Sequence, residues 1–143
     1  PEGFVAHCMH FIERAHLCKM SEEEALLISK CTTLEDACLF FQQKSNATIC
    51  VTLGKNGTLV SIPNQPLFTV DTIRIEAIDT TGSGDAFIGC LLAEWAKTTS
   101  GSVITDKVWL TSTVVLANKA GAFTALSYGA IAALPRVSDL ATL

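Results

Sequence analysis

The sequence lacks the patterns of several protein classes. Only 17% of its 143 residues are charged, and its ten Lys and Arg are scattered along a chain of net charge −4. No basic stripe could follow a phosphate backbone, so we expect no nucleic-acid partner. No apolar run reaches the ~18–20 residues that span a bilayer, and the N-terminus lacks the pattern of a signal peptide. We therefore expect no membrane partner and a soluble, cytoplasmic protein.

Closely spaced cysteine pairs are also missing. The six cysteines form no C-x-x-C motif, and each lies among apolar neighbours. A zinc site would lack its ligand pairs, and a disulfide framework does not suit so apolar a chain. We expect six reduced core thiols in a reducing compartment. His7 and His10 have no Asp or Cys ligand grouped beside them, and we interpret them as ordinary helix residues.

Length and composition indicate one globular domain. Hydrophobic residues make up 49% of the chain, and a domain of this size buries roughly 70% of its unfolded surface without a metal or disulfide. Helical periodicity alternates with short β-branched, apolar segments, which predicts an α/β fold with a mostly parallel sheet. The expected helices are residues 3–15, 21–29, 32–44, 85–96 and 106–126, with a short last helix at the end of 127–140. The expected strands are residues 16–20, 47–54, 58–62 and 68–79.

Several of these elements carry finer predictions. Ser21 with Glu24, and Thr32 with Glu35, are each spaced as a capping box at a helix start. The segment 68–79 alternates like one or two strands at a solvent edge. The helix 85–96 is apolar nearly all round, which predicts burial on most of its faces.

The stretch DTTGSGDAF, residues 79–87, combines small and acidic residues just before this apolar helix. At a helix N-terminus the free N–H groups and the dipole favour negative charge, so Gly82, Ser83 and Gly84 form a candidate anion cradle. A bound phosphate would repel Asp85, unless this carboxylate takes a proton from a group that approaches the phosphate. The pattern indicates phosphoryl transfer to a hydroxyl, with Asp85 as base.

Other interpretations of the stretch remain open. Asp85 could be a helix cap, and the glycines could serve only to shape a tight loop. Two common nucleotide-binding motifs are missing from the sequence, because LGKNGT lacks the Walker A spacing and no G-x-G-x-x-G follows an expected strand.

At these residues the chain resembles the ribokinase-like (PfkB) carbohydrate kinases. Their signature D-T-x-G-A-G-D-x-F matches DTTGSGDAF, with Ser83 in the usual alanine place, and Cys90 stands where the family has Ala or Gly. VTLGKNGTLV resembles the family's loop beside the nucleotide, and CKMSEEEALLIS its K-x-S-x-x-E motif. ANKAGAFTALSYGAIAALP resembles the end of fructokinases and aminoimidazole riboside kinases. The resemblance covers nearly all 143 residues, but corresponds to the C-terminal half of one such three-layer α/β/α kinase domain.

The resemblance implies roles for individual residues. It makes Asp85 the catalytic base and makes Gly82, Ser83 and Gly84 the anion hole. The residues implied at a monovalent cation, usually potassium, are Asp79, Thr81, Thr124, Ser127 and Gly129. The residues implied near ATP are Thr52, Gly54, Gly57, Gly84 and Asn118. Glu24 is implied to organise Mg²⁺ and its waters.

Each role has a structural alternative. Ser21 and Glu24 also form a complete capping box, residues 54–57 also suit a plain hairpin turn, and Asn118 could simply bond a neighbouring carbonyl.

The implied function is ATP-dependent phosphorylation of a primary hydroxyl of a sugar, with fructokinase as the first expectation. Aminoimidazole riboside kinase, ribokinase and other PfkB kinases are alternatives, as is a catalytically dead, kinase-like nucleotide-binding or scaffold protein. The family's sugar-binding residues and lid have no counterpart here, so we expect the isolated chain to be inactive and prone to aggregate. Relatives often dimerise through the lid, so a homodimer is expected only of the full-length protein.

Overall fold

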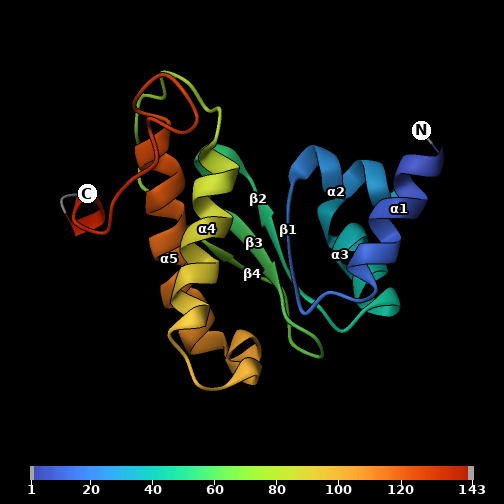
Figure 1. Ribbon diagram of the computed structural model, residues 1–143. Helices are drawn as coiled ribbons and strands as arrows, with labels where there is room; N and C mark the ends of the chain where they lie inside the picture. Colours follow the sequence, from blue (N-terminus) through green and yellow to red (C-terminus); the bar gives the residue numbers. More distant parts are fainter. Residues whose placement is uncertain (1, 142–143) are drawn as a thin grey trace. The chain divides into compact units, whose positions relative to one another are not determined.

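The computed structural model describes residues 2–141, and the chain divides into two compact units. The first unit contains the residues up to 53 together with 59–69. The second unit contains residues 54–58 and the residues from 70 onward. The elements of each unit are labelled in Figure 1.

The first unit combines three helices with a four-stranded sheet in the order β1-β2-β3-β4. The helices are α1 (Glu2–Ile12), α2 (Glu22–Ser29) and α3 (Leu34–Lys44). The strands are β1 (Leu17–Ser21), β2 (Thr48–Thr52), β3 (Thr58–Ser61) and β4 (Phe68–Val70). The first residue of β3 and the last residue of β4 are counted with the second unit.

The sheet is mixed. β1 and β2 run parallel, with a register from Leu17 opposite Thr48 to Ser21 opposite Thr52. β2 and β3 are joined only by residues 53–57, which include the 3₁₀ turn η1 (Gly54–Asn56). A connection this short cannot make a parallel crossover, so these neighbours are antiparallel. The predicted α/β class and hairpin turn are confirmed.

Apolar side chains from the helices and strands form the core of the first unit. Phe41 of α3 and Ile49 and Val51 of β2 are fully buried in it. Cys38 and Cys50 are also buried, whereas the other four cysteines are only half-buried, so the expectation of six core thiols holds for two. Burial raises the pKa of the Cys38 thiol to about 11, with a smaller contribution from Glu35. Burial, with a smaller effect of Cys18, raises the pKa of Cys50 to about 12.

The helix starts follow capping chemistry. Ser21 caps α2, its hydroxyl accepting the Glu24 N–H while the Glu24 carboxylate accepts the Ser21 N–H, as the capping-box spacing predicts. The prediction for α3 is wrong by one residue. Its N-cap is Thr33 rather than Thr32, and the Thr33 hydroxyl accepts the N–H of Asp36. Two adjacent threonines can both serve as caps in sequence, and only the helix register selects one.

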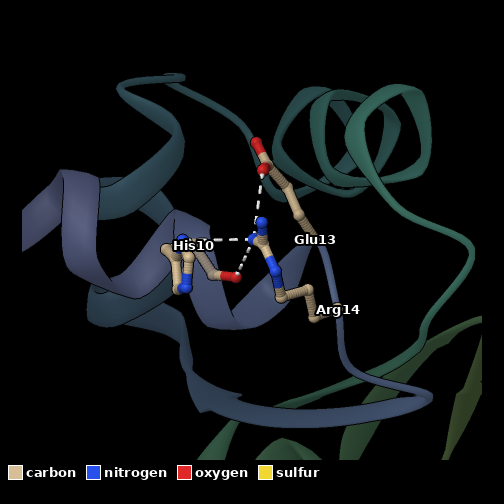
Figure 2. A network of polar contacts seen from close by, with 3 residues as sticks. All are labelled: His10, Glu13 and Arg14. Atoms are coloured by element: carbon tan, nitrogen blue, oxygen red, sulfur yellow. Dashed lines mark hydrogen bonds and ion pairs between the residues drawn. The ribbon is translucent and has the colours of Figure 1, made fainter.

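The two histidines of α1 make bonds within their own helix region. His7 Nδ1 lies 2.6 Å from the Gly3 carbonyl oxygen. Arg14 Nη1 lies 3.1 Å from His10 Nδ1 and donates to the His10 carbonyl oxygen at 2.9 Å. The same Nη1 lies 3.9 Å from the Glu13 carboxylate oxygen Oε2 (Figure 2). These contacts satisfy a carbonyl near the helix end, and they agree with the interpretation of both histidines as ordinary helix residues.

The second unit is built around α4 (Ser83–Ala96) and α5 (Lys107–Thr124), which pack against each other (Figure 1). The short 3₁₀ turns η2 (Gly101–Thr105) and η3 (Asp139–Ala141) complete it. Small residues let the helices approach closely, since a Cβ on Gly121 of α5 would lie 3.1 Å from the Ser83 carbonyl oxygen. The α5 N-cap is Asp106, whose carboxylate accepts two backbone N–H groups.

Two predictions about these segments are wrong. The buried residues of α4 are Ala86, Phe87 and Leu91, while Leu92 is 46% exposed, so the helix is fully buried along one side and not on most of its faces. An apolar sequence shows that a helix is suited to burial, but it does not show which other segments cover each face of the helix. The alternating segment 68–79 forms only the three-residue β4, and residues 71–78 have no regular structure. Within the described residues, no helix is long and apolar enough to cross a membrane.

Candidate active site

The N-terminus of α4 is the centre of the candidate site. Its N-cap is Gly82, which has the left-handed φ of 83°, and no side chain caps the helix. A Cβ on Gly82 would lie 2.9 Å from Ala130 Cα, so both the backbone conformation and the close approach of residue 130 require glycine here. A helix start without a side-chain cap keeps its N–H groups for an anion.

Ser83 differs from its neighbours in this cradle. Its backbone N–H donates to the Thr80 carbonyl oxygen at 3.1 Å, and this bond occupies the amide. The amides of Gly82 and Gly84 therefore remain as the candidates for holding an anion. The Ser83 hydroxyl is buried and, among the described residues, has no hydrogen-bond partner.

Asp85 lies in the first turn of α4 and is exposed. Because Gly82 is the N-cap, Asp85 does not cap the helix. A negative side chain at this position interacts favourably with the positive end of the helix dipole. An accessible carboxylate beside these amides can accept a proton from a group that approaches the same place.

Asp79 joins two loops next to α4. Its Oδ1 accepts the Thr81 N–H at 2.9 Å, and its Oδ2 accepts the Gly129 N–H at 3.3 Å. A hydrogen bond from the Thr81 side chain, then the backbone N–H groups of Thr81 and Gly129, lower the pKa of the Asp79 carboxyl. Asp79 is therefore negative at neutral pH.

The C-terminal end of α5 lies at the same place. The Ala125 carbonyl oxygen accepts the N–H groups of Ile78 at 2.8 Å and Asp79 at 3.3 Å. The Thr124 hydroxyl donates to the Ala120 carbonyl within the helix, so the Thr124 group offered to a ligand is its carbonyl, which accepts the Ser127 N–H at 3.4 Å. The end of α5 carries a partial negative charge. Together with Asp79, it makes a region that suits a cation.

Two further candidate residues belong to the first unit. The Glu24 carboxylate is bonded through Oε2 to the Ser21 N–H at 2.7 Å, which leaves Oε1 for another partner. The Thr52 hydroxyl donates to the Met20 carbonyl across the parallel strands. The other predicted site residues all belong to the second unit.

The loop that includes Gly54 and Gly57 belongs to the second unit, as does Asn118. The Asn118 side chain is buried and bonded to Thr58, Val70 and Asp71. The Asn118 amide therefore bonds nearby carbonyls, as the structural alternative to a role near ATP predicts. Sequence reasoning missed Thr58 altogether, because nothing in the sequence links it to a residue 60 positions away.

No group of three or more His, Cys, Asp or Glu in residues 2–141 could by itself hold a metal ion. A metal in this protein would depend on carbonyls, hydroxyls or a bound ligand for part of its coordination. A cavity of about 290 Å³ between α3 and residues 61–67 contains none of the predicted site residues.

Comparison with known families decides the identity of this arrangement. Residues 1–137 match the model of the pfkB family carbohydrate kinases. The chain belongs to this family. It is 33% identical over 132 residues to "Probable fructokinase-4" of Arabidopsis thaliana, covering 92% of this chain and 40% of the relative.

Solved structures of pfkB-type sugar kinases have the same fold. A double mutant of fructokinase from Vibrio cholerae O395, with fructose, ADP and potassium ion bound, has a TM-score of 0.91 and 29% identity, covering 99% of this chain and 44% of that one. Aminoimidazole riboside kinase from Salmonella enterica, complexed with aminoimidazole riboside and an ATP analog, has a TM-score of 0.88 and 28% identity, covering 99% and 46%. The chain thus has a ribokinase-like α/β fold and spans less than half the length of these kinases.

Proposed function

We propose that this chain is the nucleotide-binding and catalytic part of an ATP-dependent sugar kinase, with fructose as the first expected acceptor. The observation that carries the proposal is the start of α4, where Asp85 stands exposed in the first turn of a helix without a side-chain cap. Membership of the pfkB family supports the reaction class. The fructose and ADP in the related Vibrio structure support the choice of substrates.

In the proposed reaction, Asp85 takes the proton of a primary hydroxyl as its oxygen attacks the γ-phosphorus of ATP. The bond between the γ-phosphorus and the β–γ bridging oxygen breaks, and ADP leaves. The amides of Gly82 and Gly84 stabilise negative charge on the transferred group. General-base catalysis typically contributes 10²–10⁴-fold, and oriented backbone amides add electrostatic stabilisation that needs no reorganisation.

The residues fit a monovalent cation beside this helix. Asp79 is ionised, and the C-terminal carbonyls of α5 add negative potential. We infer that Asp79, Thr81, Thr124, Ser127 and Gly129 would hold potassium, the ion in the related Vibrio structure. Such an ion would keep the loop that ends at Gly82 in the shape the anion requires.

We infer that Glu24 would organise Mg²⁺, with the ATP phosphates supplying further oxygen ligands. Its free Oε1 is compatible with this role, because hard divalent cations prefer carboxylate oxygens and keep several waters. The ion would neutralise charge on the phosphates.

The proposal places the enzyme in the cytoplasm, where its free cysteines stay reduced.

A second acceptor has support of its own. The related Salmonella structure contains aminoimidazole riboside and an ATP analog, so aminoimidazole riboside kinase is the second candidate function. A kinase of full family length that contains this chain should be assayed with fructose, ribose and aminoimidazole riboside. We expect the highest kcat/KM with fructose. ATP binding without phosphorylation of any sugar would instead indicate a catalytically dead scaffold.

A further inference from the structure

Residues 54–58 belong to a different compact unit from the residues on either side of them in the sequence. They comprise most of the connection from β2 to β3 and the first residue of β3, yet they form one compact unit with α4 and α5, while Leu53 and Leu59 on either side belong to the other unit. Some contact must therefore hold this loop to the second unit. The described hydrogen bonds identify Asn118 of α5 as its centre.

Asn118 is 7% exposed and uses both ends of its side-chain amide. Its Oδ1 accepts the Thr58 hydroxyl at 2.7 Å. Its Nδ2 donates to the Val70 carbonyl at 3.2 Å and to the Asp71 carbonyl at 3.1 Å. A primary amide has two N–H donors, so neither is left for a nucleotide base.

Gly57 closes the same junction from the backbone side. It has a φ of 84°, and a Cβ placed on it would lie 2.1 Å from the Val70 carbonyl oxygen, which is the oxygen that Asn118 also binds. The end of the loop, Val70 and α5 thus meet at one point. No side chain larger than hydrogen fits at residue 57 without moving the backbone.

We propose that Asn118 is a positioning residue for the loop 54–57. It acts on a nucleotide by holding this loop against α5, and it does not contact the base itself. The inference rests on the proposed function only in taking this loop as part of the nucleotide site. Loss of the Asn118 amide would leave the Thr58 hydroxyl and two carbonyls without their partner, which loosens the loop before it affects α5.

The first test measures backbone hydrogen exchange of residues 54–58 in this chain, without any nucleotide. Thr58→Val and Asn118→Ala should each speed exchange there at least tenfold, and Thr58→Ser should restore protection because it keeps the hydroxyl. The matched control is Thr113→Val on the same helix, since Thr113 is similarly buried and, among the described residues, its hydroxyl donates to the Trp109 carbonyl within α5. This control should leave exchange of the loop unchanged.

The second test measures ATP in a kinase of full family length that contains this chain. Thr58→Val and Asn118→Ala should raise KM for ATP about tenfold with little change in kcat, and Thr58→Ser should not. Weaker ATP binding in Asn118→Ala but not in Thr58→Val would indicate direct contact with the base and overturn the proposal. So would unchanged exchange of residues 54–58 in Thr58→Val. Failure of the wild-type protein to bind ATP would refute the proposed function, while the exchange result would still decide whether Asn118 positions the loop.

Discussion

Single side chains around the start of α4 have separable tasks. Asp85 offers an exposed carboxylate, Asp79 ties two loops together through N–H groups, and Gly82 admits residue 130 at close range. Ser83 is the exception, because its buried hydroxyl has no partner among the described residues. The family pattern has alanine at this position, which would remove the unsatisfied group.

Ser83→Ala should stabilise the folded chain. A buried, unsatisfied hydroxyl costs roughly 1–3 kcal/mol, so removing it should raise the free energy of unfolding by about 1 kcal/mol. Urea denaturation of the wild-type and variant chains measures the difference. A clear loss of stability in Ser83→Ala would mean that the hydroxyl has a favourable partner.

The second prediction concerns Asp79 and pH. Its pKa is lowered in the folded chain by the Thr81 side chain and by the N–H groups of Thr81 and Gly129. The unfolded chain therefore binds this proton first as the pH falls, and the stabilisation is present above the unfolded pKa of about 3.9 and lost below it. Urea titrations between pH 7 and pH 3 should show a shallower acid loss of stability in Asp79→Asn. An equal loss of the free energy of unfolding with falling pH in the wild-type chain and in Asp79→Asn would contradict this prediction.

At the scale of elements, much of the chain could be predicted from pattern and capping. The helices near residues 2–12, 22–29 and 107–124 and the buried strand at 48–52 follow from apolar periodicity and β-branched residues. Periodicity does not show which segment a helix or strand packs against. The segment 71–78 alternates as a strand would but forms no strand, and α4 is apolar nearly all round but fully buried along one side only. The Thr58–Asn118 bond joins residues 60 apart, and no local signal indicates it.

The start of α3 gives a prediction for a single helix. Thr33 caps α3 and Thr32 does not, so Thr33→Ala should lower the free energy of unfolding by about 1 kcal/mol. Thr32→Ala is the matched control and should change it by much less. Urea denaturation of both variants is sufficient, and an equal or larger loss in Thr32→Ala would show that the helix begins one residue earlier.

The chain as a whole spans less than half the length of the kinases it matches, and under the proposed function it supplies their phosphate-handling part. The family resemblance implies that the sugar-binding residues have no counterpart in this chain, and a base without a positioned hydroxyl accomplishes little. The 143 residues alone should therefore show no measurable sugar phosphorylation. The capacity for turnover is expected only in a kinase of full family length.

If Asp85 is the base of phosphoryl transfer, Asp85→Asn should separate turnover from ATP affinity, so both are measured in this variant. The variant should be made in a kinase of full family length that contains this chain. Because Asp85 is exposed, the substitution should leave folding and the Kd of MgATP within about twofold. We predict that kcat falls by about 10²–10⁴-fold, the usual contribution of a general base. A kcat close to that of the wild-type enzyme would show that Asp85 is not the base.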